Sequence, residues 1–148
     1  MRIIVGVDDS PFSAAAVNFV RGMVWPMGTS VEVICAVPLV LVAIPESYMV
    51  MSEQLETVRR EQRAASGSYV KSVERDLAAS GLKTRSRVVD GDPRDLLLEA
   101  AREGHADLIV VGSHGRTGMV KLFMGSVASH VVTHAPCSVL VVRAPVTP

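Results

Sequence analysis

A glycine-rich segment near the C-terminus has the residue types and spacing of a phosphate-binding loop. Residues 112–115 read Gly-Ser-His-Gly, and Gly125 and Ser126 follow after nine intervening residues. Glycine lacks a Cβ atom, so the backbone N–H groups of such a loop can converge on an anion. A helix that starts at Ser126 would add the positive end of its dipole. The segment therefore predicts phosphate binding.

The expected donors of this loop are mainly backbone N–H groups. Those of residues 113–116, Ser126 and Val127 would face the α- and β-phosphates of a nucleotide. The Arg116 guanidinium and the serine hydroxyl would add side-chain donors. The alternative is a simple turn, with a solvated arginine and a serine that only caps a helix.

Other motifs for nucleotide binding or catalysis do not fit the sequence. The spacing Gly-x2-Gly-x9-Gly-Ser is neither a Walker loop nor Gly-x-Gly-x-x-Gly, which disfavours a P-loop motor and a dehydrogenase. A Gly-x-Ser-x-Gly nucleophile elbow is missing too. His130 and His134 lack the glutamate of a His-Glu-x-x-His zinc motif, so we expect surface or packing roles for them.

Asp8 is the second candidate for ligand contact. It ends an apolar run at residues 3–7, and Ser10 can cap the helix that follows. The Asp8 carboxylate would then be available to ribose hydroxyls or to a phosphate-bound metal ion. The alternative is that Asp8 or Asp9 only complements the dipole of that helix.

Strand-like and helix-like patterns alternate along the whole chain. The expected strands are residues 2–8, 30–37, 83–89, 107–111 and 137–142. The expected helices begin at Pro11, near Met51, at Pro93 and at Ser126. This alternation predicts an α/β fold, a doubly wound five-stranded parallel sheet of Rossmann type. In the order 3-2-1-4-5, strands one and four are central, so Asp8 and Gly112 would meet at their carboxyl ends.

Apolar spacing predicts the inner faces of the first two helices. The first stripe is Phe12, Ala16, Phe19 and Met23, and the second is Leu55, Val58, Ala65, Tyr69, Val73 and Leu77. The apolar connection at residues 38–48 has no clear period. It could be core, a dimer contact, an exposed partner-binding patch or a lid.

Four motifs together resemble the nucleotide-binding branch of the universal stress protein family. They are Ile3-Ile4-Val5-Gly6-Val7-Asp8, Gly91-Asp92-Pro93, Val110-Val111-Gly112-Ser113-His114-Gly115-Arg116 and Pro136-Cys137-Ser138-Val139-Leu140-Val141-Val142. The resemblance implies a small α/β homodimer that binds ATP. It adds Gly6 and Val37 as adenine contacts, and it implies that His114 contributes its backbone. The resulting site comprises Gly6, Asp8, Val37, Gly112, Ser113, His114, Gly115, Arg116, Gly125, Ser126 and Val127.

Composition narrows the class of protein. The chain has 148 residues, 49% of them apolar, and its 15 basic and 15 acidic residues cancel. Net charge therefore predicts neither a nucleic-acid partner nor an anionic membrane partner. The N-terminus lacks a secretory signal pattern, which favours the cytoplasm. We expect one domain over residues 1–144, a flexible tail at 145–148, and buried thiols at Cys35 and Cys137.

These observations lead to one hypothesis and one alternative. The hypothesis is a cytoplasmic, ATP-binding homodimer in stress adaptation, with Mg²⁺ or Mn²⁺ bridging the phosphates and at most slow hydrolysis. The dimer would pair the exposed fifth strand, at Val139, Leu140, Val141 and Val142. The alternative is a protein-interaction or chaperone-like module that binds no nucleotide, in which the glycine loop is architectural.

Overall fold

A computed structural model describes residues 1–38, 49–116 and 124–144, with side chains from residue 56 onward in the second range. In chain order the elements are β1 (Arg2–Val7), α1 (Pro11–Gly22), β2 (Ser30–Val37), α2 (Met49–Ala79), β3 (Lys83–Asp90), α3 (Pro93–Glu103), β4 (Leu108–Gly112), α4 (Ser126–His134) and β5 (Ser138–Val142). Every expected element is present, with ends shifted by one or two residues. Residues 39–48 of the apolar connection and the tail at 145–148 lie outside the described ranges.

The five strands form one parallel sheet in the order β3-β2-β1-β4-β5, which confirms the expected topology. β1 lies between β2 and β4, with Gly6 opposite Ile34 on one side and Val111 on the other. The connections that follow β1 and β4 therefore both leave from the carboxyl ends of the strands, on the same side of the sheet. Doubly wound sheets bind their ligands at these carboxyl ends, at the point where the strand order reverses.

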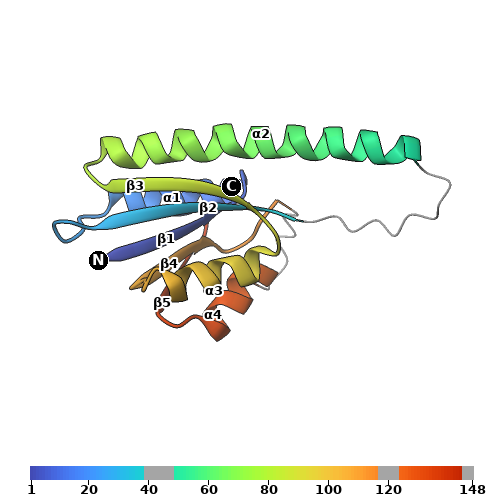
Figure 1. The fold of residues 1–148 in the computed structure, drawn as a ribbon. Coiled ribbons are helices and arrows are strands. Elements are labelled where there is room, and N and C mark those ends of the chain that lie inside the picture. The colour runs from blue at the N-terminus through green and yellow to red at the C-terminus, as the bar shows by residue number, and fades with distance from the viewer. Residues whose placement is uncertain (39–48, 117–123, 145–148) are drawn as a thin grey trace, which may run out of the picture.

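α1 and α2 cover one face of the sheet, and α3 and α4 cover the other (Figure 1). An apolar cluster lies under each pair of helices. The cluster under α1 and α2 includes Ile3, Val5, Val17, Val20, Val33, Val73 and Leu77. The cluster under α3 and α4 includes Ile4, Ile34, Leu97, Ile109 and Val131. Strands that are buried on both faces read as continuous apolar runs, which explains why the central strands show no alternation.

The inner face of α1 differs from the expected stripe. Ala16 is buried as expected, but Phe19 is 38% exposed and Met23, at the C-cap, is 47% exposed. The buried face instead passes through Val17 and Val20. Both sets recur at helical spacing, so periodicity alone did not decide which of them faces the sheet.

α2 is longer than the sheet that it covers. A helix of 31 residues spans about 46 Å, whereas the eight residues of β3 span about 26 Å. Figure 1 shows its N-terminal part extending beyond the strands. Val73 and Leu77 are buried as expected, but Val58 is 48% exposed and Ala65 is exposed, so that part of the expected stripe is wrong. Within the described ranges, no helix is both long and apolar enough to cross a membrane.

The two edge strands have opposite characters. On β3, Lys83, Arg85 and Arg87 are exposed, and Glu32 of β2 forms ion pairs with Arg85 at 2.8 Å and Arg87 at 2.9 Å. On β5, the apolar residues 139–142 are all half-buried. Charged side chains protect a strand edge from pairing, whereas an apolar edge invites it.

The two cysteines lie on opposite faces of the sheet. Cys35 is 1% exposed in the cluster under α1 and α2, and Cys137 packs against the cluster under α3 and α4. Burial raises the pKa of both thiols. Both are free, and the sheet between them prevents a disulfide within the chain. Cys35 is buried as expected, but Cys137 is only half-buried.

Candidate functional site

Asp8 connects the end of β1 to the glycine loop after β4. Its Oδ2 atom accepts a hydrogen bond from the backbone N–H of Arg116 at 2.9 Å. Its Oδ1 atom accepts from the hydroxyl of Ser10 at 2.6 Å and from the backbone N–H of Ser10 at 3.2 Å. The two loops expected to meet at this edge of the sheet are therefore in contact, although 108 residues separate them in the sequence.

Ser10 has two functions at the start of α1. Its hydroxyl oxygen accepts from the backbone N–H of Ser13 at 3.1 Å, which is the predicted N-cap, while its hydroxyl proton points to Asp8. Ser10 is 4% exposed and Ser13 is 2% exposed, so both serine side chains are buried. A buried hydroxyl that both donates and accepts fixes the Asp8 carboxylate in one orientation.

Tyr69 of α2 extends this hydrogen-bonded group. Its hydroxyl lies 3.3 Å from the Ser13 hydroxyl. Burial raises the pKa of Tyr69, and the Asp8 and Asp9 carboxylates raise it further. The sequence placed Tyr69 only in an apolar stripe. Its position about three turns before the end of a long helix gave no signal that it would point to this site.

Ser113 is held at both backbone groups. Its N–H donates to the carbonyl of Val142 at 2.8 Å, and its carbonyl accepts from the N–H of Gly125 at 2.8 Å. Two of the expected phosphate donors, the N–H groups of Ser113 and Arg116, therefore already donate hydrogen bonds to other residues of the protein. The bond to Gly125 does join the two glycine segments, as the spacing predicted.

The loop glycines are required by close packing. A Cβ atom on Gly112 would lie 2.6 Å from the backbone carbonyl carbon of Phe12, and one on Gly115 would lie 2.6 Å from Oδ2 of Asp8. A Cβ on Gly125 would lie 3.0 Å from Cα of His114. Gly112 thus lets β4 end against the first turn of α1, and Gly115 lets the loop approach the Asp8 carboxylate.

The His114 side chain packs within the site. Its ring centroid is 5.0 Å from that of Phe12 at an interplanar angle of 48°, and Nδ1 lies 3.1 Å from the Ser113 hydroxyl. An imidazole held in this way is poorly placed to act as a mobile general base. The expected contribution of the His114 backbone to ligand binding stays a prediction.

The start of α4 faces the same region. Its N-cap is Gly125, which has no side chain to accept a capping hydrogen bond. The first-turn N–H groups of Ser126 and Val127 therefore point out of the helix end without a side-chain cap. Ser126 and Arg116 are exposed, and Val127 is half-buried. These groups remain the candidate donors for an anion.

Gly6 and Val37 occupy different positions relative to the site. Val37 is the last residue of β2, beside the end of β1, and its carbonyl accepts from the N–H of Gly91 at 2.9 Å. Gly6 lies one residue inside β1, and a Cβ there would lie 2.9 Å from Cδ1 of Leu97 on α3. Val37 therefore lies at the carboxyl ends of the central strands, whereas packing against α3 accounts for Gly6; an adenine contact of either residue stays a prediction.

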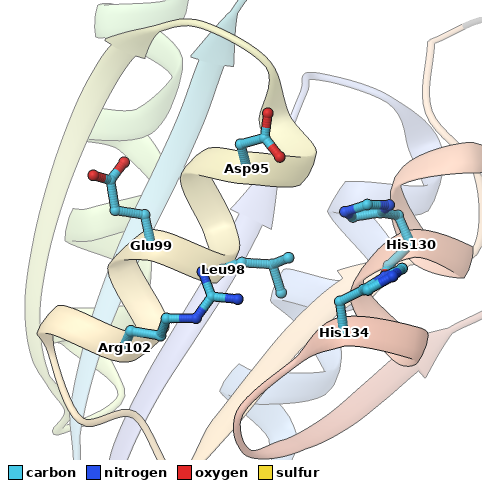
Figure 2. A pocket seen from close by; sticks show the side chains of 6 residues that line it. All are labelled: Asp95, Leu98, Glu99, Arg102, His130 and His134. Carbon is cyan, nitrogen blue, oxygen red and sulfur yellow. The ribbon is translucent and has the colours of Figure 1, made fainter.

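Two surface depressions lie away from this site. One, of about 430 Å³, lies between α3 and α4 and is lined by Asp95, Leu98, Glu99, Arg102, His130 and His134 (Figure 2). The other, of about 560 Å³, lies at the amino ends of the strands, near Arg2, Glu32 and Arg85.

The His130 and His134 rings stack with centroids 4.3 Å apart. Among the described residues, no cluster of three or more His, Cys, Asp or Glu side chains is placed to hold a metal ion.

Comparison with known proteins identifies the family. The sequence profile of the universal stress protein family matches residues 1–143. The chain belongs to the universal stress protein family. Universal stress protein MJ0531 of Methanocaldococcus jannaschii is 30% identical over 147 residues, which cover 97% of this chain and 82% of the relative.

Solved universal stress protein structures share the fold. The structure of protein MJ0577 from Methanocaldococcus jannaschii superposes with a TM-score of 0.82 at 21% identity, covering 99% of this chain and 97% of that one. A universal stress protein in complex with cAMP matches with a TM-score of 0.67 at 23% identity, covering 98% of each chain. An Arabidopsis thaliana family member with AMP bound matches with a TM-score of 0.67 at 18% identity, covering 99% and 93%.

Proposed function

We propose that residues 1–144 form a single nucleotide-binding unit that binds ATP at the carboxyl ends of β1 and β4. The observation that carries the proposal is the contact between Asp8 and the glycine loop, because it brings a carboxylate and a phosphate-type loop to the edge where such sheets bind ligands. Family members with AMP and with cAMP bound support an adenine nucleotide as the ligand.

Each part of the nucleotide has candidate contacts. The phosphates would take the first-turn N–H groups of α4 at Ser126 and Val127, together with the loop at residues 112–116. The ribose hydroxyls would donate to Asp8. The adenine would lie near Val37 at the end of β2 and near Gly6 on the neighbouring strand β1. The exposed Arg116 side chain would balance phosphate charge.

Mg²⁺ or Mn²⁺ would bridge the phosphates and take most of its ligands from phosphate oxygens and water, which is how Mg²⁺ commonly binds nucleotides. Hydrolysis would be slow. A general base must orient the attacking water, but Asp8 is held by Ser10 and by the loop, and His114 is packed against Phe12.

The proposed assembly is a homodimer that pairs the two β5 edges. The four half-buried apolar residues at 139–142 form an edge without protecting charges. Pairing across a two-fold axis would bury them and satisfy the outer backbone groups of β5. We further propose that nucleotide occupancy of this dimer acts as a signal in stress adaptation in the cytoplasm.

One set of contacts favours the alternative of an interaction or chaperone-like module. Packing against Phe12 already requires Gly112, and internal hydrogen bonds use the N–H groups of Ser113 and Arg116. In that case the loop would be architectural and nucleotide binding would be weak or absent.

Mass spectrometry of ligand released from gently purified protein separates the two functions. It would be combined with ATP titration calorimetry, with and without Mg²⁺. We expect copurified nucleotide or saturable binding of ATP. Protein that carries no nucleotide and gives no binding heat with ATP would favour the interaction module.

A further inference from the structure

Asp8 accepts a hydrogen bond from a loop N–H group that is among the expected phosphate donors. Its Oδ2 atom accepts the Arg116 N–H and lies 2.6 Å from the place where a Cβ on Gly115 would stand. A carboxylate oxygen in this position resembles a phosphate oxygen in charge and in hydrogen-bond capacity. One backbone N–H group of the glycine loop is therefore hydrogen-bonded to the chain's own carboxylate.

We propose that Asp8 is a specificity-determining residue that selects nucleotides over free polyphosphates by competing for the loop. The inference rests on the proposed function, because it concerns the same phosphate position. A phosphate that takes the Arg116 N–H deprives Oδ2 of its donor and brings two negative charges together. Entry of any phosphate at this position therefore carries a cost.

A ribose offsets this cost and a bare polyphosphate does not. When the phosphate takes the loop N–H, the vicinal hydroxyls of a ribose can donate to the released Oδ2 atom. Tripolyphosphate has no hydroxyl donors, so it would leave the Oδ2 atom of Asp8 unpaired beside an anion. Sites discriminate strongly when the wrong ligand leaves a polar group without a partner.

The neighbouring contacts keep Asp8 in place for this selection. Oδ1 is held by the hydroxyl and the N–H of Ser10, and Ser10 itself is 4% exposed. The carboxylate cannot turn away without losing these bonds. Ser10 is therefore a positioning residue, and Asp8 stays beside the loop whether or not a ligand is bound.

The test compares tripolyphosphate and ATP as ligands of the wild-type protein and of Asp8→Asn. The asparagine keeps the size of the side chain and removes the charge. Asp9→Asn is the matched control, since Asp9 is an adjacent exposed carboxylate, and asparagine tolerates the positive φ of 60° found there. The control measures the effect of removing one negative charge near the site without touching the loop contact.

We expect Asp8→Asn to bind tripolyphosphate about tenfold more tightly than the wild type, since one hydrogen bond to a charged group has this scale. Affinity for ATP should not increase in parallel, so the preference for ATP should shrink. Asp9→Asn should change either affinity by less than about threefold. An unchanged or weaker affinity of Asp8→Asn for tripolyphosphate overturns the proposal, and so does an equal gain in Asp9→Asn.

A second measurement needs only the wild-type protein and covers the case in which Asp8→Asn does not fold. The wild type should bind 2′,3′-dideoxy-ATP about tenfold more weakly than ATP, because the dideoxyribose has no hydroxyls to donate to Asp8. Equal affinities would refute the selection. If the wild type binds no nucleotide at all, the proposed function fails. A gain of tripolyphosphate binding in Asp8→Asn would then still support Asp8 as a block on the loop, and no gain would refute it.

Discussion

Oδ2 of Asp8 and the backbone N–H of Arg116 form a 2.9 Å hydrogen bond between the first and the fourth strand-to-helix connections. It is the direct link between the two sequence motifs that indicated a nucleotide site. The carboxylate is fixed from the other side by Ser10, which also caps α1. The start of α1 and the glycine loop therefore form one hydrogen-bonded unit.

Gly115→Ala tests this unit through the loop. The new Cβ would lie 2.6 Å from Oδ2 of Asp8, so either the carboxylate or the loop must move. We expect ATP affinity to fall about tenfold or more, because the loop N–H groups would lose their alignment. Titration calorimetry measures the affinity, and a thermal melt checks that the protein is folded. Affinity equal to that of the wild type would remove the loop from the binding site.

Gly112→Ala should instead destabilise the fold. Its Cβ would meet the Phe12 backbone at 2.6 Å, and backbone atoms at the start of α1 cannot move aside as a flexible side chain can. Overpacking of this kind costs about 1–3 kcal/mol of the free energy of unfolding. The matched control is Gly67→Ala in α2, where nothing lies within 4 Å of the new Cβ. The control should gain about 0.5–1 kcal/mol through helix propensity. Urea unfolding of both variants measures the two effects, and a loss in both would contradict the packing argument.

Asp92 should make stability depend on pH in the acid range. It caps α3 through the Arg94 N–H at 2.8 Å, and the Arg94 guanidinium lowers the pKa of its carboxyl from 3.8 to about 2. The folded state therefore binds this proton less readily than the unfolded state. The contribution is complete above about pH 4 and is lost as the pH falls toward 2. Asp92→Asn keeps the cap, but the urea concentration at the midpoint of unfolding should change less between pH 4 and pH 2 than it does in the wild type. A midpoint that varies as steeply in the variant as in the wild type would exclude this role.

The two thiols should react at different rates. Burial raises the pKa of both, but Cys35 is 1% exposed while Cys137 is half-buried. We expect a thiol reagent at neutral pH to modify Cys137 slowly and Cys35 only on unfolding, because the thiolate is the reactive form. Mass spectrometry of timed samples gives the order of modification. Early labelling of Cys35 would mean that the cluster under α1 and α2 opens in the native state.

Val141→Lys tests the proposed dimer. A lysine at this half-buried edge position should prevent strand pairing between two chains and give a monomeric mass by light scattering. Thr84→Lys on β3 is the control, because it adds the same charge to the other edge strand. A wild-type protein that is already monomeric at micromolar concentration would refute the dimer.

The sequence predicted the fold and the meeting of its two motifs because both follow from general rules. Five apolar strands alternating with helices allow few topologies, and in the order found, Asp8 and Gly112 must lie at one edge. The internal use of the Ser113 N–H was not predictable, because it depends on where β5 ends relative to β4.

The incorrect helix faces have similar causes. In α1, Phe19 and Val20 belong to two stripes of equal periodicity, and only the packing against the sheet decides between them. In α2, Val58 is exposed because the helix is longer than the strands below it, and the length of that overlap is a property of the folded chain.

The unlike edges of the sheet also limit how far it can grow. Strand addition at β5 would join two chains and leave a β3 at each end of the shared sheet. Those ends carry Lys83, Arg85 and Arg87, so the next chain would meet a row of cations and not an apolar edge. Association through edges would thus stop at two chains, because the charged β3 edge opposes the further strand addition that a fibril needs.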